Sequence, residues 1–141
     1  MTPPESMFEH SEVIEALTRM LNAGPLDHLP KRRGDIEVLL ALAAAQFRAR
    51  HTYREDEVNA QLAAWLDKFT VSGAFDHVTL RRFAVDRRLL LRNAAGTAYR
   101  LNTGLLAAQI SEAAQAIDPG EVLASLQNER DRRKRERAAK Q

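Results

Sequence analysis

The stretch 76–100, DHVTLRRFAVDRRLLLRNAAGTAYR, constrains the fold more than any other part of the chain. Asp76 is a good helix N-cap, and the residues after it to about position 87 place their apolar side chains on one helical face. Two β-prone runs follow directly, 89–92 and 97–101, separated by the turn sequence Asn-Ala-Ala-Gly. Short apolar runs around such a turn indicate a β-hairpin. The sequence therefore predicts a short helix that leads at once into a hairpin.

Two more helices are predicted before this stretch. Residues 35–49 are the most apolar part of the chain and repeat their large side chains at helical intervals, which indicates a central core helix. Thr52 and Glu55 have capping-box spacing and would start a second helix that runs to about Leu66. Three helices followed by a hairpin is the order of a winged helix, whose third helix is the recognition helix and whose hairpin is the wing.

The two flanks predict extra helices. Residues 8–22 and about 103–117 show helical apolar spacing, and Asp118-Pro119 begins a last helix that turns wholly polar. The predicted fold class is mainly α with a small β-hairpin. It consists of a winged helix-turn-helix domain with extra N- and C-terminal helices. The segments are an N-terminal helical extension at 1–27, the winged-helix domain at 28–102, and a C-terminal helical extension with a basic tail at 103–141.

Charge is distributed unevenly along the chain, whose formal net charge is +2. Residues 75–100 carry six arginines against two aspartates, a net of +4, whereas residues 1–22 have a net of −3. Residues 129–141 carry seven basic side chains against three acidic ones, again +4. Two basic blocks on a nearly neutral chain indicate a polyanionic partner. For the tail alone we favour a solvated helix with i,i+4 ion pairs over an arm that binds nucleic acid.

Three motifs carry a resemblance to a known family. They are LPK at 29–31, HTYREDEVNAQL at 51–62, and the stretch 76–100. Over about residues 28–102 the chain resembles a bacterial family known as domain of unknown function number twenty eighty-seven. The resemblance implies a winged-helix-like fold, found alone or joined to helix-turn-helix regulators, with nucleic-acid binding as the expected activity. Arg88 stands where that family often has Gly, so the chain either leaves the third helix differently or carries strain there.

The candidate interface combines the third helix with the wing. Side chains in the first turns of a recognition helix reach base edges, and arginine matches guanine best. Arginines at the helix end and on the wing would hold phosphates. The predicted set is His77, Thr79, Arg81, Arg82, Arg87, Arg88, Arg92 and Arg100. An alternative stays open for Arg81 and Arg82, which could instead pair with acidic residues 55–57 and lock two helices together. For Asn59 we favour a hydrogen bond to a buried backbone group over a ligand contact.

The motif inventory argues against an enzyme. The chain has no cysteine and no Gly-rich phosphate loop, and its four histidines lack metal-ligand spacing, so no cofactor and no metal are predicted. No apolar run is long enough for a membrane span, and the absence of cysteine suits the cytoplasm.

The first functional hypothesis is a nucleic-acid-binding protein, with double-stranded DNA as partner and transcriptional regulation as role. Regulators read two-fold sites as dimers, and the flanking helices could supply a homodimer interface. The alternative is a protein-interaction module that docks through the acidic first helix and an apolar stripe. That stripe would be Leu106, Ile110, Ala113 and Ile117. Binding to structured RNA is a third hypothesis.

Overall fold

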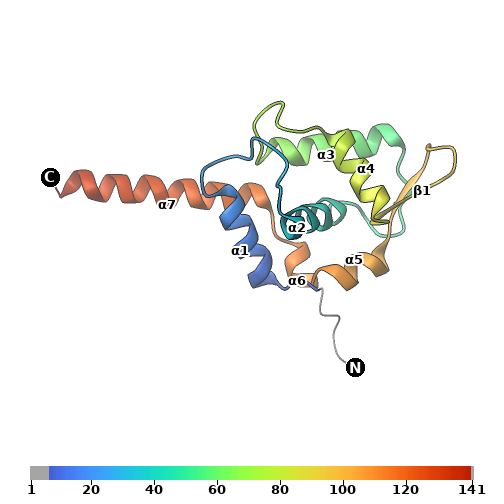
Figure 1. Cartoon of the computed structure of the whole chain (residues 1–141), viewed down its shortest axis with the longest axis horizontal. Coiled ribbons are helices and arrows are strands. Elements are labelled where there is room, and N and C mark those ends of the chain that lie inside the picture. Colours follow the sequence, from blue (N-terminus) through green and yellow to red (C-terminus); the bar gives the residue numbers. More distant parts are fainter. Residues whose placement is uncertain (1–6, 141) are drawn as a thin grey trace, which may run out of the picture.

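The computed structural model describes residues 7–140 and is mainly helical (Figure 1). These residues form seven helices and one two-stranded antiparallel hairpin, joined by loops. The elements in chain order are α1 (His10–Leu21), α2 (Arg33–Ala44), α3 (Glu55–Asp67), α4 (His77–Asp86), β1 (Leu90–Arg92), β2 (Tyr99–Leu101), α5 (Thr103–Gln109), α6 (Glu112–Gln115) and α7 (Pro119–Ala139). The predicted helix followed at once by a hairpin is therefore confirmed as α4, β1 and β2.

Helix α2 is the centre of the core. Figure 1 shows it surrounded by α1, α3, α4 and α5. Every side chain from Val38 to Ala44 is at most 1% exposed, so the helix is buried on all sides over this run. Such a helix needs no polar face, which explains the long apolar run in the sequence. It ends at Ala44, earlier than the predicted position 49, because the N–H groups of Gln46 and Phe47 donate to carbonyls three residues back instead of four; the chain then reaches a left-handed residue at Arg50, φ 63°.

The flanking helices share this core with the central segment. Val13, Leu17 and Leu21 of α1 are fully buried, and Leu123 anchors the start of α7 in the same cluster. The prediction of one helix over about 103–117 is wrong. Ile110 adopts extended angles, φ −144° and ψ 136°, and separates α5 from α6. The break occurs because the backbone on either side of Ile110 pairs with Phe8: the Phe8 N–H donates to Gln109 O at 2.8 Å, and the Ser111 N–H donates to Phe8 O at 2.9 Å.

Burial removes most of the apolar docking stripe that the protein-interaction alternative used. Leu106, Ile110 and Ile117 are 3%, 0% and 7% exposed, so their side chains belong to the core, and only Ala113 of the predicted four is exposed. A partner therefore could not reach the three core residues without unfolding the C-terminal part of the domain.

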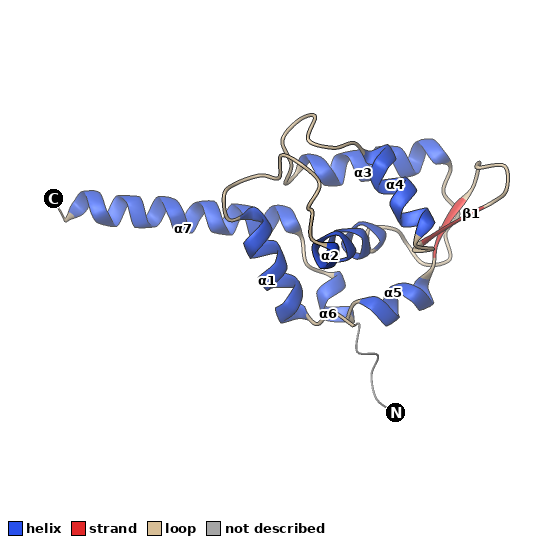
Figure 2. Cartoon of the chain, in the orientation of Figure 1, coloured by secondary structure: helices blue, strands red, loops and turns tan. Residues whose placement is uncertain are grey.

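The first turns of helix α7 pack on the other helices, and the rest of the helix projects into solvent. Asp118 caps it as predicted, accepting a hydrogen bond from the Gly120 N–H at 2.8 Å, with Pro119 at the first helical position. Beyond Leu126 the helix is polar and projects away from the other elements (Figure 2). Within residues 7–140, no helix combines the length and the apolar character that a membrane span requires.

Candidate nucleic-acid interface

Helix α4 begins at the predicted cap. The Asp76 carboxylate accepts a hydrogen bond from the Thr79 N–H at 2.8 Å, and this bond is the main cause that lowers the pKa of Asp76 below its usual value of 3.8. Leu80 and Ala84 are buried against the core. The opposite side of α4 is left to solvent, where Arg82 and Asp86 are exposed, and His77 and Thr79 in the first turn are partly exposed. The burial of Leu80 and Ala84 thus fixes which face of α4 a partner could meet.

Arg81 lies inside the fold. Its guanidinium pairs with Glu55 at 3.1 Å, donates a hydrogen bond to Asn59 Oδ1 and lies 5.9 Å from the centre of the Tyr99 ring. Only 14% of its side chain is exposed. For Arg81 the structure therefore shows the alternative contact, an ion pair that holds α3 and α4 together. Asn59 strengthens the same contact: it accepts a hydrogen bond from the Arg81 side chain, whereas the sequence favoured a hydrogen bond to a buried backbone group.

Arg87 is also held by the chain itself. Its Nε donates to Glu37 Oε1 at 2.8 Å, and its guanidinium lies 5.3 Å from the centre of the Phe83 ring. Both partners of the ion pair are mostly buried, with side chains 32% and 26% exposed. This contact ties the end of α4 to α2, so Arg87 is not free to hold a phosphate.

Four other predicted arginines point into solvent. Arg82, Arg88, Arg92 and Arg100 are exposed, and none of them forms an ion pair with another described residue. Arg82 lies on α4, Arg88 just after it, and the other two on the hairpin. The predicted set of eight thus divides into two structural arginines, four free arginines and two polar residues near the start of α4.

The hairpin holds its arginines at a fixed register. Leu90 pairs with Leu101, Leu91 with Arg100, and Arg92 with Tyr99. At the tip, Asn93 Oδ1 accepts hydrogen bonds from the N–H groups of Thr97 at 2.8 Å and Ala98 at 3.1 Å. Gly96 takes a left-handed φ of 72°, with the Arg92 guanidinium packed where a Cβ atom would be. The tip is therefore closed by its own hydrogen bonds.

A groove of about 390 Å³ separates α4 from the hairpin. It is lined by Val78, Arg81, Arg82, Val85, Asp86, Arg92 and Tyr99. Arg82 and Arg92 are its free cations, from α4 and β1 respectively, and Asp86 is its one carboxylate. Val78 and Val85 add apolar surface of the kind that contacts a thymine methyl group.

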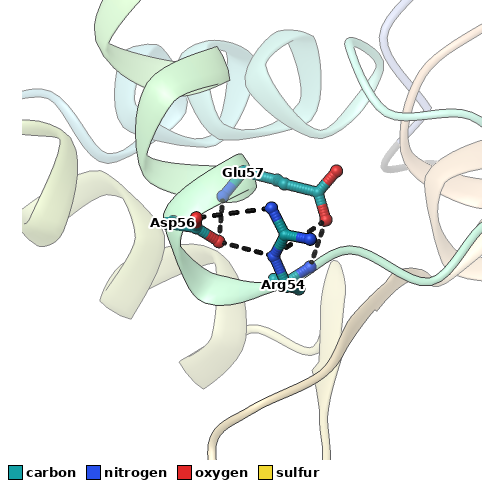
Figure 3. A network of polar contacts seen from close by, with 3 residues as sticks. All are labelled: Arg54, Asp56 and Glu57. Atoms are coloured by element: carbon teal, nitrogen blue, oxygen red, sulfur yellow. Dashed lines mark hydrogen bonds and ion pairs between the residues drawn. The ribbon is translucent and has the colours of Figure 1, made fainter.

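Arg54 pairs with two acidic residues at the start of α3, Asp56 and Glu57 (Figure 3). Arg54 Nε pairs with Asp56 at 3.0 Å and lies 3.8 Å from Glu57, while the Arg54 N–H donates to Glu57 Oε1 at 2.9 Å. The hydrogen bond from Arg54 is the main cause that lowers the pKa of Asp56. The predicted cap at Thr52 is wrong, because α3 starts two residues later with Arg54 as its N-cap residue. Tyr53 lies between them and pairs with β2, which delays the helix.

The comparison with family models matches residues 25–101 to a family described as an uncharacterized protein conserved in bacteria (DUF2087). The match covers more than half of the 141 residues. The chain belongs to this family. No curated protein matched the chain, and no solved structure matched it.

The DUF2087 region contains the whole candidate interface. It begins before α2 and ends at Leu101, so α3, α4 and the hairpin lie inside it, while α1 and α5 to α7 lie outside. The family description names no activity. Within residues 7–140 no group of three or more histidine or acidic side chains is arranged to hold a metal ion.

Two residues close the end of α4, and the sequence indicated only one of them. Arg88 has a left-handed φ of 63°, so this non-glycine residue carries the strain that the family comparison predicted. The Asn102 side chain donates to Arg88 O at 2.9 Å and accepts from the Leu105 N–H at 3.3 Å, which links α4 to α5. Asn102 lies fourteen residues after Arg88, and no local pattern connects the two positions.

Proposed function

We propose that this chain is a winged-helix protein that binds double-stranded DNA through α4 and the β1–β2 hairpin, and that its role is transcriptional regulation. The order of elements supports the fold: α2, α3 and α4 precede the hairpin. Tyr53, between α2 and α3, exchanges two backbone hydrogen bonds of 2.8 Å with Tyr99 of β2. This pairing supports the proposed fold, because a winged helix has a short third strand that pairs with the wing.

One observation carries the choice of ligand. The motif around α4 has six arginines, of which two are bound within the fold and four face solvent without a carboxylate partner among residues 7–140. Exposed arginines that serve the fold would be expected to pair with acidic neighbours, as Arg54 does. Four unpaired arginines on one helix and its adjoining hairpin suit a row of phosphates and a base edge.

The arrangement assigns a role to each group. In the proposal α4 enters the major groove and Arg82 reads a base edge, because it is the exposed arginine in the first two turns of this helix. Arg88, Arg92 and Arg100 hold phosphates on either side of the groove. Arg81 and Arg87 keep α4 in place and make no contact with DNA. A regulator of this kind would bind a two-fold site as a dimer.

The test is binding of the full chain to a labelled DNA duplex over a series of salt concentrations. Three phosphate contacts from α4 and the hairpin predict a contribution of about −2.7 to the slope of log K against log salt. The variant Arg82→Gln/Arg92→Gln removes the base contact and one phosphate contact, so it should weaken binding, reduce that slope by about 0.9 and keep the wild-type thermal stability. The matched control, Arg132→Gln/Arg135→Gln, removes the same charge from α7 at the far end of the molecule.

Three results would overturn the proposal. The first is no binding even at low salt, and the second is equal loss in the two double variants, which would reflect net charge alone. The third is tighter binding to an RNA duplex of the same length than to DNA, which would favour the structured-RNA hypothesis.

A further inference from the structure

The outer part of α7 is a free helix with no apolar face. Residues 130–140 are exposed at every position, and Figure 2 shows this part of the helix projecting from the body on the side away from the hairpin. At 1.5 Å per residue the eleven positions span about 15 Å. Its only apolar side chains, Ala138 and Ala139, are too small and too few to pack on a body or to form a coiled-coil seam.

The charges of this segment are sorted around the helix. At about 100° per residue, five cations fall within an arc of roughly 120°. We call them the basic stripe: Arg130, Arg133, Lys134, Arg137 and Lys140. The acidic residues Glu129, Asp131 and Glu136 fall outside this arc.

Arg132, opposite the stripe, holds two of those three acids. It pairs with Glu136 at 2.6 Å and also with Glu129, and its hydrogen bond is the main cause that lowers the pKa of Glu129. Arg133 lies 3.3 Å from Glu129 at the edge of the stripe. Lys134, Arg137 and Lys140 form no ion pair with any residue from 7 to 140.

This pattern is unfavourable for an isolated helix. Stripe residues are spaced three or four apart, so like charges lie next to each other along the helix and destabilise it. The i,i+4 ion pairs expected of a solvated helix are present between Arg132 and Glu136 and between Arg133 and Glu129, but they leave the other stripe cations without a carboxylate partner among residues 7–140. At its inner end the stripe is fixed to the body, where Arg130 donates a hydrogen bond to the Asn22 carbonyl. The repulsion is relieved where a polyanion lies along the stripe.

We propose that the basic stripe of α7 binds the phosphate backbone of the same DNA molecule that α4 and the hairpin contact. This inference rests on the proposed function. A duplex carries one charge per about 1.7 Å of its axis, so about nine phosphate charges occur along the length of the stripe. Because α7 leaves the body on the side away from the hairpin (Figure 1), the stripe contacts phosphates outside the segment that α4 covers.

The test compares two duplex lengths and two matched variants of the full chain. Arg133→Gln/Arg137→Gln changes the stripe, and Arg132→Gln/Arg135→Gln changes the other side of the same helix by the same charge. On a duplex of roughly 40 base pairs the stripe variant should lower the salt slope by about 1.8 and the affinity at 0.1 M salt on the order of 50-fold. On roughly 15 base pairs, which α4 and the hairpin alone can cover, it should bind like wild type.

The control variant loses more ion pairs of the helix yet should bind both duplexes normally. Circular dichroism verifies that both variants keep α7 helical. Equal loss in the two variants, or no loss in the stripe variant, would overturn the inference. Failure of the proposed function looks different: the short duplex is then not bound by wild type, and Arg82→Gln/Arg92→Gln does not change binding to the long one.

Discussion

Replacing Arg88 by glycine should make the protein more stable and its DNA binding weaker. Arg88 is the residue that ends α4, with φ 63°. The Leu89 N–H donates to Ala84 O and the Arg88 N–H to Val85 O, each at 2.9 Å. These two bonds form the helix ending that normally places glycine at the left-handed position.

The size of the gain follows from two opposing terms. A residue with a Cβ atom loses about 1–2 kcal/mol in the left-handed conformation. Glycine adds freedom to the unfolded chain, which costs about 0.4–1 kcal/mol. The net increase in the free energy of unfolding is therefore about 0.5–1 kcal/mol. With an unfolding entropy of about 2.1 cal/mol/K per residue over 141 residues, Tm rises by about 2–3 °C.

The assay is thermal unfolding beside DNA binding, with two controls. Arg50 has the same φ of 63° in an exposed turn, so Arg50→Gly should raise Tm by a similar amount and leave the salt slope unchanged. Arg88→Ala removes the charge and keeps the strain, so its Tm should not rise. Both Arg88 variants should reduce the salt slope by about 0.9, the contribution of one phosphate contact.

A lower Tm for Arg88→Gly would refute the strain argument, because it would mean that the arginine side chain stabilises the fold. An unchanged salt slope in both Arg88 variants would remove this residue from the proposed interface.

Three further predictions concern the same region. Arg81→Ala should lower the free energy of unfolding by about 2 kcal/mol, because it leaves Glu55 and Asn59 without their charged partner. The control Arg82→Ala should stay within about 0.5 kcal/mol of wild type, and urea unfolding of both variants tests this difference. Asp76→Ala should cost about 1 kcal/mol at pH 7. Because folding lowers the Asp76 pKa below 3.8, the wild-type advantage is complete above that value and is lost as the pH falls through the folded pKa, which urea unfolding between pH 7 and pH 2.5 would show. Gly96→Ala should cost about 1–2 kcal/mol, since it needs a left-handed φ and displaces Arg92; an unchanged Tm would contradict the hairpin geometry.

Local chemistry determined most of the elements. The Asp76 cap, the turn before Gly96 and the Asp118-Pro119 start of α7 all lie where the sequence predicted them, because each depends on contacts between residues a few positions apart. The apolar run of α2 likewise identified the centre of the core. The family resemblance identified from the motifs agrees with the matched range 25–101.

Contacts between distant residues decided the remaining features. The break between α5 and α6 depends on Phe8, about a hundred positions away along the chain, and the start of α3 depends on the pairing of Tyr53 with Tyr99. The roles of neighbouring arginines were decided in the same way: Arg81 and Arg82 are adjacent in sequence, yet one faces Glu55 and Asn59 while the other faces solvent. A 100° step around a helix separates them, and only the position of α3 determines which of the two is buried.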